Sequence, residues 1–132
     1  MTIRAALETR LAAMSPALAT QWENAAFTPV AGTPYQAVSL VMATPQNPTI
    51  GDGLYRELGF LQVTLRYPQN GGAGAAEAQA RMLRAWFPRG LSLTVDGVTV
   101  TVSATPDIRP AFTDGDRYAV PVRVPFFANI FS

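Results

Sequence analysis

One segment, from Gly59 to Phe87, constrains the fold most, because its hydrophobic period changes from that of a strand to that of a helix. The first part alternates apolar and polar residues, which predicts a half-buried strand with these apolar positions: Leu61, Val63, Leu65 and Tyr67. Pro68 ends the strand, and a glycine-rich turn follows. Apolar residues then recur at helical spacing: Ala76, Ala80, Leu83 and Phe87. We therefore expect a helix to lie across one face of a β-sheet.

The glycine-rich turn lies where nucleotide-binding proteins hold a phosphate, but its residues do not suit that role. A phosphate-binding loop needs Lys followed by Ser or Thr at the start of the helix, whereas this helix starts with Ala75, Ala76 and Glu77. The Glu77 carboxylate would also repel a phosphate at the positive end of the helix dipole. We expect a structural loop and no cofactor.

The composition removes most catalytic chemistry. The chain has no His and no Cys, and all ten of its cationic residues are Arg. It therefore lacks the commonest general base, the usual zinc ligands, and the nucleophiles of thiol and Schiff-base catalysis. We expect no catalytic residues and no metal site, and hence no enzyme. A net charge of +1 also argues against strong nonspecific DNA binding.

The length and the low charge predict one domain that associates with partners. A chain of 132 residues suits a single domain over residues 1–132. Only 14% of the residues are charged, against about 25% in typical proteins, so we expect part of the surface to be buried by partner subunits. No apolar stretch reaches the length of about 20 residues that spans a bilayer. Glu8 and Arg10 interrupt the position of a signal-peptide core, so we expect the product to stay in the cytoplasm of the cell that makes it.

The remaining periodic segments predict one more helix and several strands. A first amphipathic helix is expected up to about Met14, with Trp22 and Phe27 packed against it. Strands are expected at 36–43, on both sides of an Asp96-Gly97 turn, and at 117–127, with irregular chain at 21–35 and 105–115. This order predicts an α+β fold, with a mostly antiparallel sheet of about five strands and two helices packed on it.

Two features of the predicted strands lead to further expectations. Pro121 and Pro125 remove N–H donors from the same edge of the last strand, which predicts an edge strand or a strand that is fully paired on only one side. The hairpin around Asp96-Gly97 has one apolar face and one face of Ser and Thr hydroxyls. That hydroxyl face is either plain solvent-facing surface or the polar surface of a small ligand-binding module.

The longest non-periodic segment, Thr44–Glu57, joins the first two long strands. Its only charged residues are Asp52, Arg56 and Glu57. A loop of this length in a compact domain is usually functional or mobile. We expect it to project from the sheet as a long hairpin arm.

Taken as a set, these features resemble the tail terminator, or tail completion, proteins of lambda-like long-tailed phages and prophages. The similarity lies in the amphipathic first helix, the Trp22-Glu23-Asn24 segment with Phe27-Thr28-Pro29, and the Gly32-Thr33-Pro34-Tyr35 entry to a strand. It continues through the GFLQVTLRYP strand, the helix ending in Trp86-Phe87 and the late valine-rich strand. These are packing and turn positions, and none is a catalytic signature.

The resemblance implies a structural function in the virion tail, with assembly in the host bacterial cytoplasm. The family forms a ring, expected to be a hexamer that forms in solution or only on the tube. It caps the tail tube, stops polymerisation and offers an interface to head-completion proteins. DNA would only pass through the ring, and no membrane is involved. The alternative is another tail or head–tail component, such as a tube subunit or a connector.

By the same resemblance, the long arm would reach a neighbouring subunit or the end of the tube. Some arginines would form inter-subunit pairs or line a DNA channel, including Arg81 and Arg84. The candidate partner-interface residues are Asp52, Leu54, Tyr55, Arg56, Glu57, Arg66 and Arg123.

Overall fold

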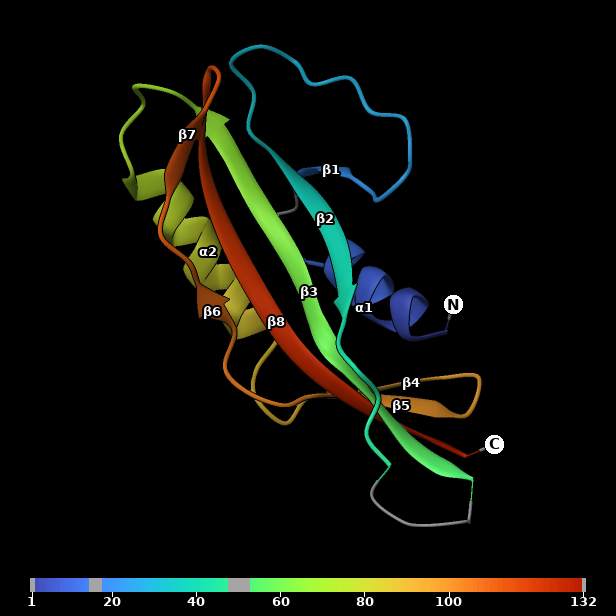
Figure 1. The fold of residues 1–132 in the computed structure, drawn as a ribbon. Helices are drawn as coiled ribbons and strands as arrows, with labels where there is room; N and C mark the ends of the chain where they lie inside the picture. Colours follow the sequence, from blue (N-terminus) through green and yellow to red (C-terminus); the bar gives the residue numbers. More distant parts are fainter. Residues whose placement is uncertain (1, 15–17, 48–52, 132) are drawn as a thin grey trace.

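The computed structural model describes residues 2–14, 18–47 and 53–131, which form two helices and eight strands (Figure 1). In chain order these are α1 Thr2–Ala12, β1 Ala19–Gln21, β2 Tyr35–Met42, β3 Leu54–Pro68, α2 Gly74–Trp86, β4 Ser92–Val95, β5 Val98–Val102, β6 Asp107–Ile108, β7 Phe112–Asp114 and β8 Arg117–Phe131. The expected α+β class with two helices is confirmed.

The strands form one curled, mixed sheet in the order β1-β2-β3-β8-β5-β4, with β6 and β7 also paired to β8. Its centre is a long antiparallel ribbon of β3 and β8, in register from Leu54↔Phe131 to Pro68↔Arg117. Only the pairing of β1 with β2 is parallel among the described strands. The expectation of about five strands was therefore too low. The additional strands β1, β6 and β7 have two or three residues each, too few to show a period.

Strand β8 pairs differently on its two sides, as its prolines predicted. It pairs with β3 along its whole length, but on its other side it pairs in turn with three short strands, β5, β6 and β7. The Pro121 and Pro125 carbonyls face this interrupted side, where they accept hydrogen bonds from the N–H groups of Arg109 (2.8 Å) and Ser103 (3.0 Å). Because neither proline has an N–H, no continuous ladder can form there. The second alternative, a strand fully paired on one side, is confirmed.

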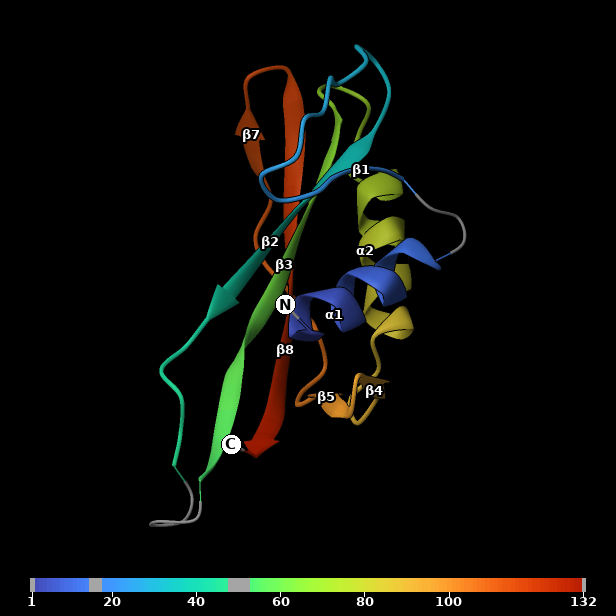
Figure 2. The same cartoon turned by 90° about the vertical axis from the view of Figure 1, so that its right-hand side faces the viewer.

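Both helices cover the same face of the sheet (Figure 2). Three odd-numbered residues of β3 are fully buried beneath them: Leu61, Val63 and Leu65. In α2 the predicted stripe is also buried, and Phe87 directly after the helix has no exposed surface. The sheet curls so that β4 and β5 lie against α1. Trp22 packs against this core, whereas the Phe27 ring lies 5.2 Å from the Tyr35 ring.

The two helices are joined by a reciprocal contact between Arg10 and Trp86 that sequence periodicity did not indicate. The Arg10 guanidinium donates to the Trp86 carbonyl at 2.8 and 3.2 Å, and the Trp86 indole Nε1 donates to the Arg10 carbonyl at 2.6 Å. The guanidinium also lies 3.9 Å from the centre of the indole ring. This cation binds a carbonyl in the last turn of α2, where the helix dipole favours positive charge.

Candidate functional site

The sheet face opposite to the helices carries the candidate site, because no helix of the described chain covers it (Figure 2). Strand alternation places the even-numbered residues of β3 and the odd-numbered residues of β8 on this open face. Three predicted interface arginines therefore share it: Arg56 and Arg66 of β3, and Arg123 of β8. Sequence reasoning named these three arginines, and the fold brings them to one side of the domain.

Arginines on this face stack on aromatic rings. The Arg56 guanidinium lies 5.0 Å from the centre of the Phe127 ring, and that of Arg123 lies 4.8 Å from the centre of the Phe60 ring. Both distances lie within the range of cation–π attraction. The rings hold the two guanidiniums in place while part of each side chain stays in contact with solvent.

The arginines differ in whether their charge is neutralised. Arg66 forms an ion pair with Asp114 at 2.5 Å. Arg56 and Arg123 instead donate to neutral amide oxygens, at 3.0 Å to Asn129 and at 3.2 Å to Gln62. Among the described residues, no carboxylate lies within ion-pair distance of either of these two guanidiniums. This part of the open face therefore presents two guanidiniums without an ion-pair partner in the described chain.

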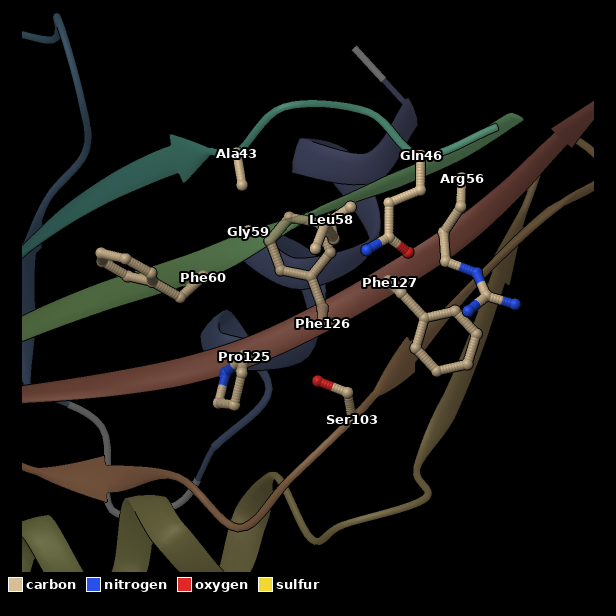
Figure 3. Close-up of a pocket in the computed structure, with 10 residues that line it drawn as sticks. All are labelled: Ala43, Gln46, Arg56, Leu58, Gly59, Phe60, Ser103, Pro125, Phe126 and Phe127. Carbon is tan, nitrogen blue, oxygen red and sulfur yellow. The ribbon is translucent and has the colours of Figure 1, made fainter. Parts of the chain in front are cut away.

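A shallow groove of about 390 Å³ lies beside these charges (Figure 3). We call it the open-face groove, and it is lined by Ala43, Gln46, Arg56, Leu58, Gly59, Phe60, Ser103, Pro125, Phe126 and Phe127. Gly59 is required where the chain passes closest to β2, because a Cβ atom there would overlap the carbonyl oxygen of Val41. The groove is mainly apolar, and the Arg56 side chain lies at one end of it.

Two of the other predicted interface residues point away from this face. Tyr55 and Glu57 lie at odd positions of β3 and point to the opposite side. Leu54, the first residue of β3, lies at an even position and so shares the open face, whereas Asp52 lies outside the described residues. The expectation that the whole of Thr44–Glu57 is non-periodic loop was wrong, because β3 starts at Leu54. The first residues of β3 pair with the end of β8, which continues past Phe127, the predicted end of the last strand. These pairs form a projecting ribbon (Figure 1).

The arginines of α2 lie on the other side of the molecule. Arg81 and Arg84 are exposed on this helix, which covers the opposite face of the sheet. The Arg84 Nε donates to the carbonyl of Pro106 at 3.0 Å, so it ties α2 to the chain that leads into β6. The structure therefore divides the arginines that sequence reasoning grouped together into two separate surfaces.

The hydroxyl face of the β4–β5 hairpin is paired internally. Ser92 and Thr101 oxygens lie 3.3 Å apart, and those of Thr94 and Thr99 lie 2.9 Å apart. These cross-strand bonds occupy the hydroxyls that a ligand would otherwise use. Within residues 2–14, 18–47 and 53–131, no cluster of three potential metal ligands occurs. No described helix has both the length and the apolar character needed to cross a membrane.

Arg117 is a structural residue that sequence reasoning missed. It is only 6% exposed, and its guanidinium donates to the carbonyls of Thr33 (2.6 Å) and Val30 (2.8 Å). It also lies 5.0 Å from the centre of the Tyr35 ring. These contacts hold the segment 22–34 against the start of β8. They join residues more than 80 positions apart, so no local pattern could indicate them.

Glu23 fastens the same segment at the edge of β2. Its carboxylate accepts a hydrogen bond from the Leu40 backbone N–H at 2.8 Å and another from Arg4 at 3.0 Å. These donors, first the Leu40 N–H and then the Arg4 guanidinium, hold the pKa of the Glu23 carboxyl below its usual value. The carboxylate thus fills an edge position of the sheet with a charged acceptor.

We expect the stabilisation from Glu23 to be lost in acid. A carboxyl whose pKa is lowered by folding stabilises the protein fully above its unfolded pKa of about 4.3, and less as the pH falls through the lower folded value. Because the side chain is 41% exposed, the effect should be small, about 0.2–1 kcal/mol. Urea unfolding of the wild type and of Glu23→Gln should show a difference at pH 7 that shrinks as the pH falls below the unfolded pKa. A difference independent of pH would contradict this assignment.

Comparisons with known proteins agree with this architecture. One solved protein structure superposes with a TM-score of 0.79 at 29% identity, covering 99% of this chain and 96% of the solved chain. A search of curated proteins finds no significant match. The profile of a family described as phage tail terminator protein matches residues 2–126, which is nearly the whole chain. The chain therefore belongs to the family of phage tail terminator proteins.

Proposed function

We propose that this protein assembles as a hexameric ring on the head-proximal end of the phage tail tube. There it stops tube polymerisation and presents the surface to which head-completion proteins attach. Membership of the family gives the chain a structural role in the virion tail, in association with other tail components. The ring, its position and its partners are the content of the proposal, together with assembly in the host bacterial cytoplasm.

The observation that carries the proposal is the open sheet face. In a domain that functioned alone, we would expect other elements to cover this face, or charged residues to occupy it throughout. Exposed apolar patches usually mark interaction sites. Here Phe60, Pro125 and Phe127 remain half-buried beside the guanidiniums of Arg56 and Arg123, which have no ion-pair partner among the described residues. Such a surface suits association with protein partners, with apolar contacts and arginines combined.

The mechanism is capping by surface complementarity, without a chemical step. A ring requires two different surfaces on each subunit that meet head to tail and close. The projecting β3–β8 ribbon, which carries Leu54, Tyr55, Arg56 and Glu57 on β3, supplies a surface that extends past the body of the domain (Figure 1). In this proposal the ribbon reaches a neighbouring subunit or the end of the tube, and DNA passes through the closed ring without specific binding.

Tails assembled with and without the protein test this function. We expect tubes assembled in its absence to be overlong and to lack heads, because nothing stops the addition of tube subunits. Electron microscopy of negatively stained tails measures the length distribution, and adding back the purified protein should restore a single length.

The same experiment separates the alternatives. Loss of a tube subunit would leave no tubes, and loss of a connector would leave tails of normal length without heads. Either of these two outcomes would refute the terminator role.

A further inference from the structure

The open-face groove and the β7–β8 turn have matching chemistry at two different places on the domain. We propose that the groove of one subunit receives the β7–β8 turn, residues 112–117, of a second copy of this chain. This inference rests on the proposed ring and names the two surfaces that would meet in it.

The groove offers an apolar floor and positive charge. Leu58, Phe60, Pro125 and Phe127 provide the floor. Arg56 lies at the groove, and Arg123 stacks on the Phe60 ring, both without a carboxylate partner in the described chain. A ligand for this surface should therefore combine an apolar side chain with an anionic group.

The β7–β8 turn carries such a combination. Phe112 is 47% exposed, and it is the one aromatic residue among the exposed large hydrophobic residues of the described structure. The Asp116 side chain is 84% exposed, and its cation partner within ion-pair distance is Arg117 at 3.9 Å. That guanidinium already donates to two backbone carbonyls, so the Asp116 charge is little compensated. An exposed aromatic ring and a carboxylate thus lie on one hairpin turn.

The two surfaces cannot meet within one molecule. Arg117 of the turn pairs with Pro68 at the end of β3, whereas the groove is lined by Phe60 and Pro125. Between Arg117 and Phe127 the β8 strand rises about 33 Å, at about 3.3 Å per residue. The contact is therefore between copies and joins two different patches. Contacts of this type close into rings when the rotation between subunits allows it.

Because the chain has no cysteine, introduced thiols report this contact without background. Ser103 lies at the edge of the groove and Thr113 in the turn, and both are exposed. Their pairing partners on β8, Pro125 and Tyr118, are about 23 Å apart along the strand, too far for a disulfide within one chain. The full-length Ser103→Cys, Thr113→Cys chain should therefore give a ladder of covalent oligomers when it is oxidised or treated with a short bismaleimide.

A matched control uses the same turn thiol with a different partner. Thr99 is exposed on the β4–β5 hairpin and outside the groove. The Thr99→Cys, Thr113→Cys chain should give no ladder under identical conditions. An equal ladder from both chains would indicate random collision and overturn the proposed contact.

Charge reversal gives a second measurement that does not depend on thiol geometry. Asp116→Arg and Arg56→Glu should each lower the fraction of assembled protein about tenfold, and the doubly exchanged chain should recover it. Sedimentation of the concentrated protein, alone and with tail tubes, measures that fraction, while circular dichroism confirms that each variant is folded. Failure of the double exchange to recover assembly would contradict the pairing.

The results distinguish this contact from the ring itself. If electron microscopy finds rings or capped tubes but the groove and turn thiols do not cross-link, the docking proposal is wrong and the ring stands. If neither rings nor tube-bound protein form under any condition, the ring proposal fails and the docking proposal fails with it.

Discussion

Replacing Phe126 with Ala is expected to lower the free energy of unfolding by about 3–5 kcal/mol. Phe126 is only 1% exposed and lies in β8 between Gly59 of β3 and Val102 of β5. The glycine opposite cannot fill the space that the lost ring would leave, and a larger residue at that position is excluded by the approach of β2. A residual cavity should therefore persist, and its volume adds to the cost of losing the buried ring.

Urea unfolding, followed by the fluorescence of Trp22 and Trp86, measures this effect in dilute protein. Phe112→Ala provides the matched control, because it removes the same side chain from a position that is 47% exposed. Its free energy of unfolding should change by less than about 0.5 kcal/mol. Comparable losses in the two variants would show that burial in the β3–β8 core does not determine the cost.

Replacing Arg117 with Met is expected to cost about 3–6 kcal/mol and to release the segment 22–34. Met keeps an apolar chain of similar length, but it cannot donate to the carbonyls of Val30 and Thr33. Each hydrogen bond from a charged donor is worth about 1.5–3 kcal/mol, and the two bonds are lost together. The contact with the Tyr35 ring is weakened at the same time.

Limited proteolysis with chymotrypsin provides the local readout, because Trp22 and Phe27 lie within the segment. We expect faster cleavage between residues 22 and 34 in Arg117→Met than in the wild type. Arg109→Met is the matched control, since Arg109 is exposed and its side chain pairs only with Asp107 among the described residues. If both variants were cleaved at the wild-type rate, the anchoring role of Arg117 would be refuted.

Local rules predicted the features that depend on neighbours in the chain. The Asp96-Gly97 turn has φ angles of 51° and 79°, as a type I′ turn requires, and it joins β4 to β5 as expected. The helical period after Gly74 predicted α2 and its buried face. The two prolines of β8 indicated its interrupted side before any partner strand was known, because a missing N–H is a property of the residue itself.

Features that depend on distant partners could not be predicted in this way. Strand β6 exists because Asp107 and Ile108 lie in register with Arg123 and Val122, and two residues show no period of their own. The buried state of Arg117 depends on carbonyls in a segment more than 80 residues away. At the candidate site, residue type identified Arg56, Arg66 and Arg123, but only the β3–β8 register places them on one face. The Asp114-Gly115-Asp116 turn can be read from the sequence, but its ion pair with Arg66 cannot.

The pairing of β8 also has a consequence for the order of events during synthesis. This strand follows every other element of the sheet, yet it pairs with β3, β5, β6 and β7. Until it leaves the ribosome, β3 lacks its long partner, and β6 and β7 lack the strand with which they pair. Pairs as distant as Leu54 and Phe131 also make folding slow, because long loops must close first. In a nascent chain the open face is therefore incomplete until β8 has been made.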